Sequence, residues 1–225
     1  MDATTLIAKR IAQELRPGML ANLGVGIPTM VANYVPRDMR LYFQSENGLI
    51  GTGPIPEPGM AQGYLTDAAG HPVSALPGAA TFDSAVSFGL IRGGHLDLTV
   101  LGGLQVDQEG HLANWTIPGK MVPGMGGAMD LVTGAKRVIV AMQHTAKGKP
   151  KIVKQCSLPL TSLRTIDLLV TELAVIGFAG GRATLLETAP GVSVQEVVAA
   201  TEAELVVPDQ VPHMHFEGLS EGISS

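Results

Sequence analysis

One carboxylate in this sequence stands in a setting suited to chemistry. Glu46 follows the apolar run Leu41-Tyr42-Phe43 and precedes Gly48, Gly51 and Gly53. If that run is a strand, the glutamate lies beyond its carboxyl end, where open α/β sheets bind their ligands. Glycines there let backbone N–H groups approach a ligand with no side chain between them. A glutamate is ionised at neutral pH, so it can act as a nucleophile or as a base.

The same arrangement also has a purely structural interpretation. Acidic residues flanked by glycines are common in tight turns, where a glutamate caps a helix or accepts an ordinary hydrogen bond. The spacing around Glu46 therefore leaves a chemical and a structural role open.

Alternating helices and strands are expected to hold this residue. Apolar residues at helical spacing, Pro28 at a helix start and a capping box at Ser193 indicate helices, whereas short apolar runs that end in glycine indicate strands. Helices are predicted over residues 5–16, 29–34, 83–90, 128–133 and 193–200, and strands over residues 19–23, 41–43, 73–76, 96–101, 104–106, 112–113, 137–142, 168–170, 184–186 and 205–207.

These elements predict an α/β fold with a single open sheet over residues 1–208. The turn residues 107–110 predict a hairpin between the strands at 104–106 and 112–113. The polar residues 209–225 are expected to form a flexible C-terminal tail.

Composition and charge exclude several classes of protein. Hydrophobic residues make up 45% of the chain and charged residues 16%, which allows a packed core and argues against disorder. The net charge of -5 argues against nucleic-acid binding. The single cysteine, Cys156, excludes an internal disulfide. With no apolar run of roughly 18 residues and no secretory signal pattern, a cytoplasmic location is expected.

Five stretches, in order along the chain, resemble the beta subunits of class I (3-oxoacid) CoA-transferases, above all those that act on acetate and acetoacetate. The most specific is Gln44-Ser45-Glu46-Asn47-Gly48, which matches the Ser-Glu-Asn-Gly signature of that family. The resemblance covers residues 5–207 and implies the CoA-transferase type of open-sheet α/β fold. The other stretches are Asn22-Leu23-Gly24-Val25-Gly26-Ile27-Pro28, Ile91-Arg92-Gly93-Gly94-His95-Leu96-Asp97, residues 112–130 with Gly124-Met125-Gly126-Gly127, and Leu158-Pro159-Leu160-Thr161.

The resemblance implies a covalent reaction on Glu46. In that family the glutamate attacks the thioester carbonyl of a short-chain acyl-CoA, and the released CoA thiolate then forms a glutamyl-CoA thioester on the enzyme. An incoming carboxylate reverses these steps. Acetyl-CoA and succinyl-CoA are the implied donors and acetoacetate the implied acceptor, with butyrate and 3-oxoadipate as alternatives. CoA and acyl-CoA are substrates, and no permanently bound cofactor or metal is expected.

The same resemblance assigns roles to the glycine-rich loops. Gly126 and Gly127 are expected to offer a backbone N–H to the negatively charged oxygen of each addition step, where one preorganised donor contributes about 3 kcal/mol. A flexible loop at Gly126-Gly127 and a tight strand-to-helix turn at Gly24 and Gly26 are the structural alternatives. The residues expected to line the substrate and CoA site are Gly24, Gly26, Asn47, Gly48 and Gly51.

A partner is also implied, because family members combine this half with an alpha subunit of similar size or fuse the two halves. An α2β2 hetero-oligomer is the expected assembly. Two other functions stay open. One is a sugar-phosphate isomerase or deaminase on a related fold, with Glu46 as a base, and the other is a non-catalytic regulatory partner.

Several reactive side chains are expected to be structural. Cys156 has no neighbouring histidine in the sequence and is expected to be buried. His95 and His144 are expected to make structural hydrogen bonds. His213 and His215 are metal-ligand types, but no metal site is expected in the predicted tail.

Two further groups allow either a structural role or a role at the site. The lysine run from Lys147 to Lys154 is expected to be solvated, with contact to the phosphates of CoA as the alternative. The methionines Met121, Met125 and Met129 either pack or shape an acyl pocket.

Overall fold

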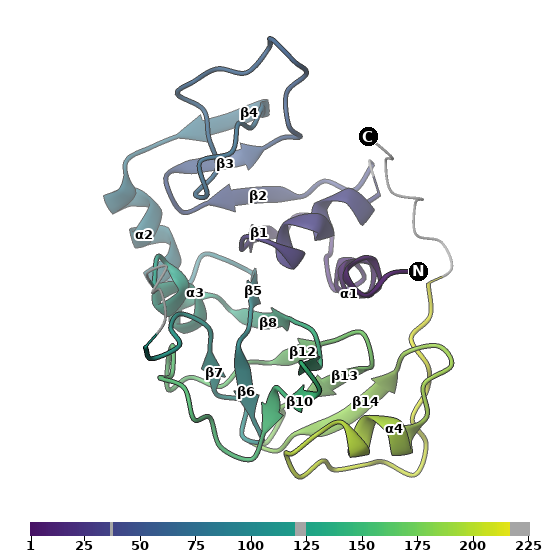
Figure 1. Cartoon of the computed structure of the whole chain (residues 1–225). Helices are drawn as coiled ribbons and strands as arrows, with labels where there is room; N and C mark the ends of the chain where they lie inside the picture. Colours follow the sequence, from purple (N-terminus) through teal and green to yellow (C-terminus); the bar gives the residue numbers. More distant parts are fainter. Residues whose placement is uncertain (37, 120–124, 217–225) are drawn as a thin grey trace.

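A nine-stranded mixed sheet forms the centre of the computed structural model, which describes residues 1–36, 38–119 and 125–216 (Figure 1). Its strands are β1 (Leu20–Leu23), β2 (Tyr42–Ser45), β3 (Leu49–Thr52), β4 (Ala75–Thr81), β5 (Leu98–Gly102), β8 (Arg137–Ala141), β12 (Leu168–Val170), β13 (Ala174–Gly177) and β14 (Thr184–Thr188). The five middle strands run parallel in the order β12-β8-β5-β1-β2. Antiparallel strands extend both ends, β13 and β14 beyond β12, and β3 and β4 beyond β2.

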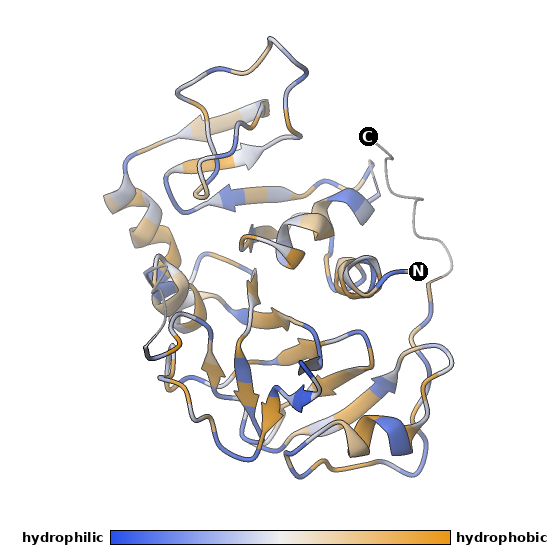
Figure 2. Ribbon diagram, in the orientation of Figure 1, coloured by the Kyte–Doolittle hydropathy of each residue, from blue (hydrophilic) through white to orange (hydrophobic). Residues whose placement is uncertain are grey.

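Helices cover both faces of this sheet. They are α1 (Ala3–Ala12), the 3₁₀ helix η1 (Ile27–Tyr34), α2 (Ser84–Arg92), α3 (Ala128–Gly134) and α4 (Val194–Ala199). In β8, Val138 and Val140 join the apolar cluster of α2 and α3, while Ile139 joins the cluster of α1 and η1. Burial on both faces explains the continuous apolar runs of the central strands, which are coloured hydrophobic in Figure 2.

The remaining strands form two small sheets. They are β6 (Gln105–Asp107), β7 (Leu112–Ala113) and β11 (Ile152–Val153) in one, and β9 (Thr145–Ala146) and β10 (Lys149–Pro150) in the other. β6 and β7 are antiparallel, which confirms the predicted hairpin. The carboxylate of Asp107 holds its turn by accepting hydrogen bonds from the backbone N–H groups of Glu109 and His111.

The single α/β domain and most of its elements are confirmed, with changes at their ends. α1 begins at Ala3 because the side chain of Asp2 accepts a hydrogen bond from the backbone N–H of Thr5 and caps the helix. β3 and β13 are absent from the predicted elements. The predicted strand over residues 205–207 is wrong, because that segment makes one isolated bridge, between Val206 and Thr184.

Residues 212–214 pack against the central sheet and so differ from the predicted flexible tail. His213 bridges Thr188 of β14, and its Nδ1 lies 2.7 Å from the Thr188 hydroxyl oxygen. Met214 is buried in the apolar cluster of α1. This buried anchor, hidden in a polar sequence, corrects the prediction for residues 213–216. Residues 217–225 lie outside the described residues.

His144, just beyond β8, is fully buried. Its ring nitrogens lie 2.9 Å from the hydroxyl oxygens of Thr171 and Thr201, which confirms the expected structural hydrogen bonds. Burial lowers the pKa of His144 from 6.5 to about 4. The folded chain therefore holds this imidazole neutral at neutral pH.

We expect this histidine to make stability fall as the pH drops from about 6.5 to about 4. In that window His144 binds a proton in the unfolded chain and not in the folded one, so its full contribution is present only above the window. Between pH 7 and pH 5, the free energy of unfolding should fall by about 2 kcal/mol more for the unchanged chain than for His144→Gln. Urea unfolding at both pH values measures this difference, and equal losses would contradict the prediction.

Candidate active site

Glu46 lies in a tight turn between two strands and does not cap a helix. Residues 46–48 connect β2 to its antiparallel neighbour β3. Gly48 has a φ of 120°, which side chains rarely adopt, and a Cβ there would lie 2.0 Å from the carbonyl oxygen of Phe82. The half-buried glutamate thus stands beyond the carboxyl end of β2, at the sheet edge where the parallel strands β1, β5 and β8 also end.

A side chain from the neighbouring strand holds the carboxylate. Asn22 of β1 is paired with Gln44 of β2. Its Nδ2 donates hydrogen bonds to Oε2 of Glu46 at 3.1 Å and to Oε1 of Gln44 at 2.9 Å. Asn22 is fully buried, so the interaction is stronger than the same contact in water. The amide therefore orients the carboxylate of Glu46.

Further buried polar groups hold that amide in place. Oγ1 of Thr99 in β5 donates to Oδ1 of Asn22 at 3.4 Å, and Nε2 of Gln44 donates to Oγ of Ser87 in α2 at 2.9 Å. All four side chains are buried. An unpaired buried polar group destabilises the fold by roughly 1–3 kcal/mol, so the network favours one arrangement of donors and acceptors. The carboxylate of Glu46 is the last acceptor of this network.

The backbone before α3 approaches the same carboxylate. A Cβ at Gly127 would lie 3.3 Å from Cγ of Glu46 and 3.4 Å from Cζ of Phe88. Gly127 is buried, whereas Gly126 is exposed with a φ of 53°. A side chain at position 127 would press against Glu46 and Phe88, so the glycine allows the backbone to approach Glu46 closely. Gly124 and Met121 of the same predicted loop lie outside the described residues.

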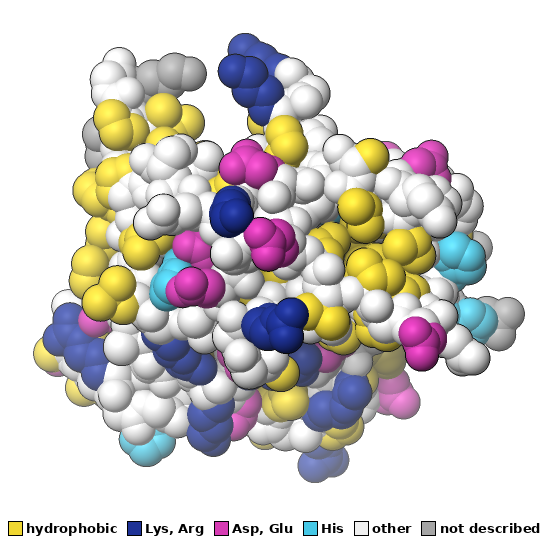
Figure 3. All heavy atoms as spheres, turned by 90° about the horizontal axis from the view of Figure 1, so that it is seen from below, with side chains coloured by type: hydrophobic (Ala, Val, Ile, Leu, Met, Phe, Trp, Pro, Cys, Tyr) yellow, Lys and Arg dark blue, Asp and Glu magenta, His cyan; other side chains and the backbone are white. Residues whose placement is uncertain are grey.

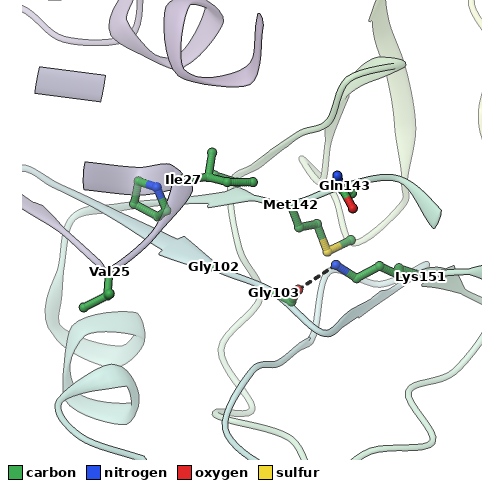
Figure 4. Close-up of a pocket in the computed structure, with 9 residues that line it drawn as sticks. Val25, Ile27, Gly102, Gly103, Met142, Gln143 and Lys151 are labelled. Carbon is green, nitrogen blue, oxygen red and sulfur yellow. Dashed lines mark hydrogen bonds between the residues drawn. The ribbon is translucent and has the colours of Figure 1, made fainter. Parts of the chain in front are cut away.

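The loop between β1 and η1 lines a pocket of about 230 Å³. Gly24 in this loop donates its N–H to the carbonyl oxygen of Val100 at 2.8 Å, and Gly26 takes a φ of 91° just before η1. The lining residues come at or directly after the carboxyl ends of β1, β5 and β8 or from the facing segment at Lys151, and Figure 4 shows the pocket. The side chains that line it include Val25, Ile27, Met142, Gln143 and Lys151.

Lys151 is the charged group of this pocket. Its Nζ donates to the carbonyl oxygen of Gly103 at 2.8 Å, as the dashed line in Figure 4 shows. Burial lowers the pKa of Lys151 below its ordinary value, and the negative charge of Glu172 counteracts part of that shift. Apolar side chains beside one partly desolvated cation suit a ligand with an apolar stem and a polar or anionic end.

Two predicted site residues shape the hairpin around Glu46. Nδ2 of Asn47 donates to the carbonyl oxygens of Thr66 at 2.8 Å and Asp67 at 3.3 Å. Gly51 has a φ of 84°, and a Cβ there would lie 2.8 Å from Cβ of Ala79 in β4. Both residues therefore have structural partners within the chain.

Cys156 and the lysine run contact groups other than Glu46. Burial, together with the negative charge of Asp107, raises the pKa of the Cys156 thiol to about 12, so the sulfur stays protonated at neutral pH. In the lysine run, Lys151 faces the pocket, Lys154 pairs with Glu204 at 3.0 Å, and Lys147 is exposed. Within the described residues there is no metal-binding group of three His, Cys, Asp or Glu side chains, and no helix long and apolar enough to cross a membrane.

Asn22 was not predicted from the sequence as the partner of Glu46. The available signal was an amide inside an apolar strand, because a buried polar group requires a hydrogen-bond partner. The sequence does not indicate which group is that partner, because Asn22 and Glu46 are 24 positions apart in the chain.

Comparison with known proteins connects this geometry to a family. The Coenzyme A transferase family model matches residues 4–200. The chain belongs to the coenzyme A transferase family. It is 57% identical to the beta subunit of the acetate CoA-transferase of Escherichia coli K12, over 92% of this chain and 95% of that protein. It is 50% identical to the beta subunit of a probable coenzyme A transferase of Bacillus subtilis 168, over 89% of this chain and 93% of that protein.

Longer proteins contain a similar segment. The mitochondrial succinyl-CoA:3-ketoacid coenzyme A transferase 2B of mouse is 46% identical over 93% of this chain, but the match spans only 41% of the mouse protein. These matches confirm the resemblance to CoA-transferase beta subunits.

Solved structures share the fold at low identity. An acyl-CoA transferase (YdiF) apoenzyme from Escherichia coli O157:H7 matches with a TM-score of 0.77 and 24% identity, over 96% of this chain and 44% of that one. The decarboxylase AibA/AibB matches with a TM-score of 0.72 and 18% identity, over 97% of this chain and 89% of that one. The fold is thus common to enzymes that are named for different reactions.

The turn that carries Glu46 yields a stability test. Gly48→Ala should lower the free energy of unfolding by about 3 kcal/mol or more, because the alanine meets both an unfavourable φ and the carbonyl of Phe82. Gly26→Ala is the matched control: its φ is also positive, but a Cβ there meets no atom within 4 Å, so only the backbone strain of about 1–3 kcal/mol is expected, without a clash. Urea unfolding compares the two variants, and equal losses would contradict the close approach at Gly48.

Proposed function

We propose that this chain is the glutamate-bearing beta subunit of an enzyme that moves CoA between a short-chain acyl-CoA and a carboxylate, with Glu46 as the covalent nucleophile. The setting of Glu46 carries the proposal. Its carboxylate stands beyond a strand end, is oriented by the buried amide of Asn22, and is approached closely by the backbone at Gly127. Family membership supports the reaction class.

The proposed chemistry uses only acyl exchange. One carboxylate oxygen of Glu46 attacks the carbonyl carbon of the acyl-CoA, and the carbon–sulfur bond breaks to release CoA thiolate. The thiolate then attacks the glutamyl carbonyl carbon of the resulting anhydride, and the acyl group leaves as a carboxylate. Glu46 now carries CoA as a thioester. A second carboxylate reverses both steps, and no net proton transfer is needed.

The surroundings of Glu46 have separate roles in this proposal. Asn22 binds one carboxylate oxygen of Glu46 and leaves the other oxygen for attack. Because this hydrogen bond restricts rotation of the carboxylate, less orientational freedom is lost when Glu46 attacks. The backbone N–H groups at Gly126 and Gly127 are the proposed donors to the tetrahedral oxyanion. The glycine at position 127 allows this backbone to approach Glu46 closely.

The pocket beside Gly24 and Gly26 is the proposed site for part of the CoA molecule. It lies at the same sheet edge as Glu46, and its apolar lining and the cation of Lys151 suit a stem that ends in polar groups. Asn47 and Gly51 act indirectly, by shaping the hairpin that holds Glu46.

The proposed substrates follow from the family resemblance of the sequence, and the relatives' names support acetate and succinyl-CoA among them. Acetyl-CoA or succinyl-CoA is the donor and acetoacetate the acceptor, with butyrate and 3-oxoadipate as alternatives. The two bacterial relatives are named as beta subunits, and the mouse protein is more than twice as long as the matched segment. We therefore propose a companion alpha subunit in a hetero-oligomer of two copies of each.

Trapping of the covalent intermediate tests the function. The native complex is incubated with acetoacetyl-CoA, and peptide mass spectrometry should find a CoA thioester on Glu46. Glu46→Gln should abolish the adduct and lower acetate-dependent exchange by about 1000-fold or more, because an amide is a poor nucleophile. Glu204→Gln, a change at an exposed glutamate paired with Lys154, should leave both unchanged. Exchange that survives Glu46→Gln, with no adduct on the unchanged chain, would overturn the covalent mechanism and leave Glu46 without a role in the exchange.

A second experiment tests the proposed role of Asn22. Asn22→Ala removes the hydrogen bond to the carboxylate of Glu46, and a hydrogen bond to a charged group contributes about 1.5–3 kcal/mol. The rate of adduct formation should fall by about 10- to 100-fold, with the adduct still on Glu46. Ser87→Ala, which perturbs the far end of the same network, should have a smaller effect on this rate. An unchanged rate in Asn22→Ala would remove the positioning role.

A further inference from the structure

One part of the molecule projects from its body without a covering layer. Residues 53–81, here called the arm, consist of the loop 53–74 and strand β4, and they form the uppermost part of Figure 1. Large apolar side chains on the arm are exposed: Ile55 is 78% exposed, Met60 71% and Tyr64 84%. Leu76 on β4 is exposed as well. Exposed apolar groups gathered on one segment indicate an interaction surface.

The arm is ordered by its own hydrogen bonds. The backbone N–H of Gly53 donates to the carbonyl oxygen of Ser74 at 2.7 Å, which closes the base of the loop. Within the loop, the backbone N–H of Val73 donates to the carbonyl oxygen of Leu65 at 3.2 Å, and Thr66 forms an antiparallel bridge with Pro72. The exposed apolar side chains are therefore presented by a structured backbone rather than by a loose loop.

Strand β4 ends the central sheet on this side. Its sequence, Ala75-Leu76-Pro77-Gly78-Ala79-Ala80-Thr81, contains no charged residue, and most of it is exposed. Natural edge strands usually carry charges, such as lysine, that prevent unwanted association. Pro77 and Gly78 limit backbone pairing with another strand. The edge nevertheless carries no charged side chain that would prevent apolar association, as expected of a surface that a partner covers.

Charge decides between two possible partners. No Lys or Arg occurs from residue 41 to residue 91, where the charged residues are Glu46, Glu57, Asp67 and Asp83. By contrast, both signs of charge are interspersed on the face seen in Figure 3. A symmetric dimer would pair the arm with itself and bring acidic groups together without a basic partner. A different chain with basic side chains around an apolar patch fits better.

The arm is tied directly to the turn that carries Glu46. Asn47 binds the carbonyl oxygens of Thr66 and Asp67, and Oγ of Ser45 accepts a hydrogen bond from the backbone N–H of Ala68 at 2.9 Å. The residues on both sides of Glu46 therefore contact the loop of the arm. A partner seated on the arm would lie next to the candidate nucleophile.

We propose that the arm is the docking surface for the companion CoA-transferase subunit, which presents an apolar patch flanked by basic side chains. The inference rests on the proposed function, because that function supplies the companion. Docking of the companion covers Ile55, Met60 and Tyr64. It also encloses the candidate active site of Glu46 on the side that faces the arm. The hydrogen bonds of Asn47 and Ser45 transmit the position of the docked arm to Glu46.

The test uses the native complex, purified through a tag on this chain, with the companion identified by peptide mass spectrometry as a coenzyme A transferase family member. The separated companion is then titrated with Ile55→Ser/Tyr64→Ser and with the unchanged chain, by native mass spectrometry. The arm variant should bind at least tenfold more weakly. Val198→Ser/Val207→Ser changes two exposed apolar residues at the far end of the sheet and should bind as the unchanged chain does.

Hydrogen exchange gives a reading that needs no substitution. Amides of residues 53–81 should exchange more slowly in the complex than in the isolated chain, and those of α4 should not change. Undiminished binding by the arm variant, or unchanged exchange in the arm, would overturn the inference while leaving the adduct on Glu46 intact. A homodimer that the arm variant alone disrupts would assign the arm to a second copy and also overturn it. A complex without any family companion would instead overturn the proposed function.

Discussion

The hydrogen bond from the buried amide of Asn22 to the carboxylate of Glu46 is the contact on which the site depends. It exists because β1 and β2 lie parallel with Asn22 opposite Gln44. A shift of one residue in this pairing would turn Asn22 to the other face of the sheet. The same amide also bonds to Gln44, and Thr99 bonds to it from β5, so three adjacent strands must keep their register for Glu46 to keep its orientation.

The change from parallel to antiparallel pairing at β2 gives the site its shape. A parallel strand would be followed by a crossover helix, whereas β2 turns back through Gly48 into β3 and continues into the arm. The candidate nucleophile therefore stands at the tip of a hairpin, with Gly127 on the body of the domain and the arm both within reach of it. One turn thus connects the chemistry to the surface proposed for the companion subunit.

The fold alone does not decide the reaction. An acyl-CoA transferase and the decarboxylase AibA/AibB match this chain with similar TM-scores, which illustrates that function belongs to the site rather than to the sheet. In this chain the site combines a carboxylate, a buried amide donor and a glycine whose backbone approaches the carboxylate closely. His144 is buried and Cys156 is partly buried, and both are held in their uncharged forms at neutral pH.

The sequence by itself determined what local patterns encode. The helices, the long apolar strands, the hairpin at Asp107 and the choice of Glu46 all depend on residues close together in the chain. Only the tertiary structure decided which of those residues meet. It brought Asn22 and Gly127 to Glu46, placed Asn47 and Gly51 against residues of the arm, added the short strands β3 and β13, and packed Met214 where a polar sequence indicated a loose tail. The reason is physical: these contacts join segments that are distant in sequence, and burial and hydrogen-bond pairing across the sheet select them.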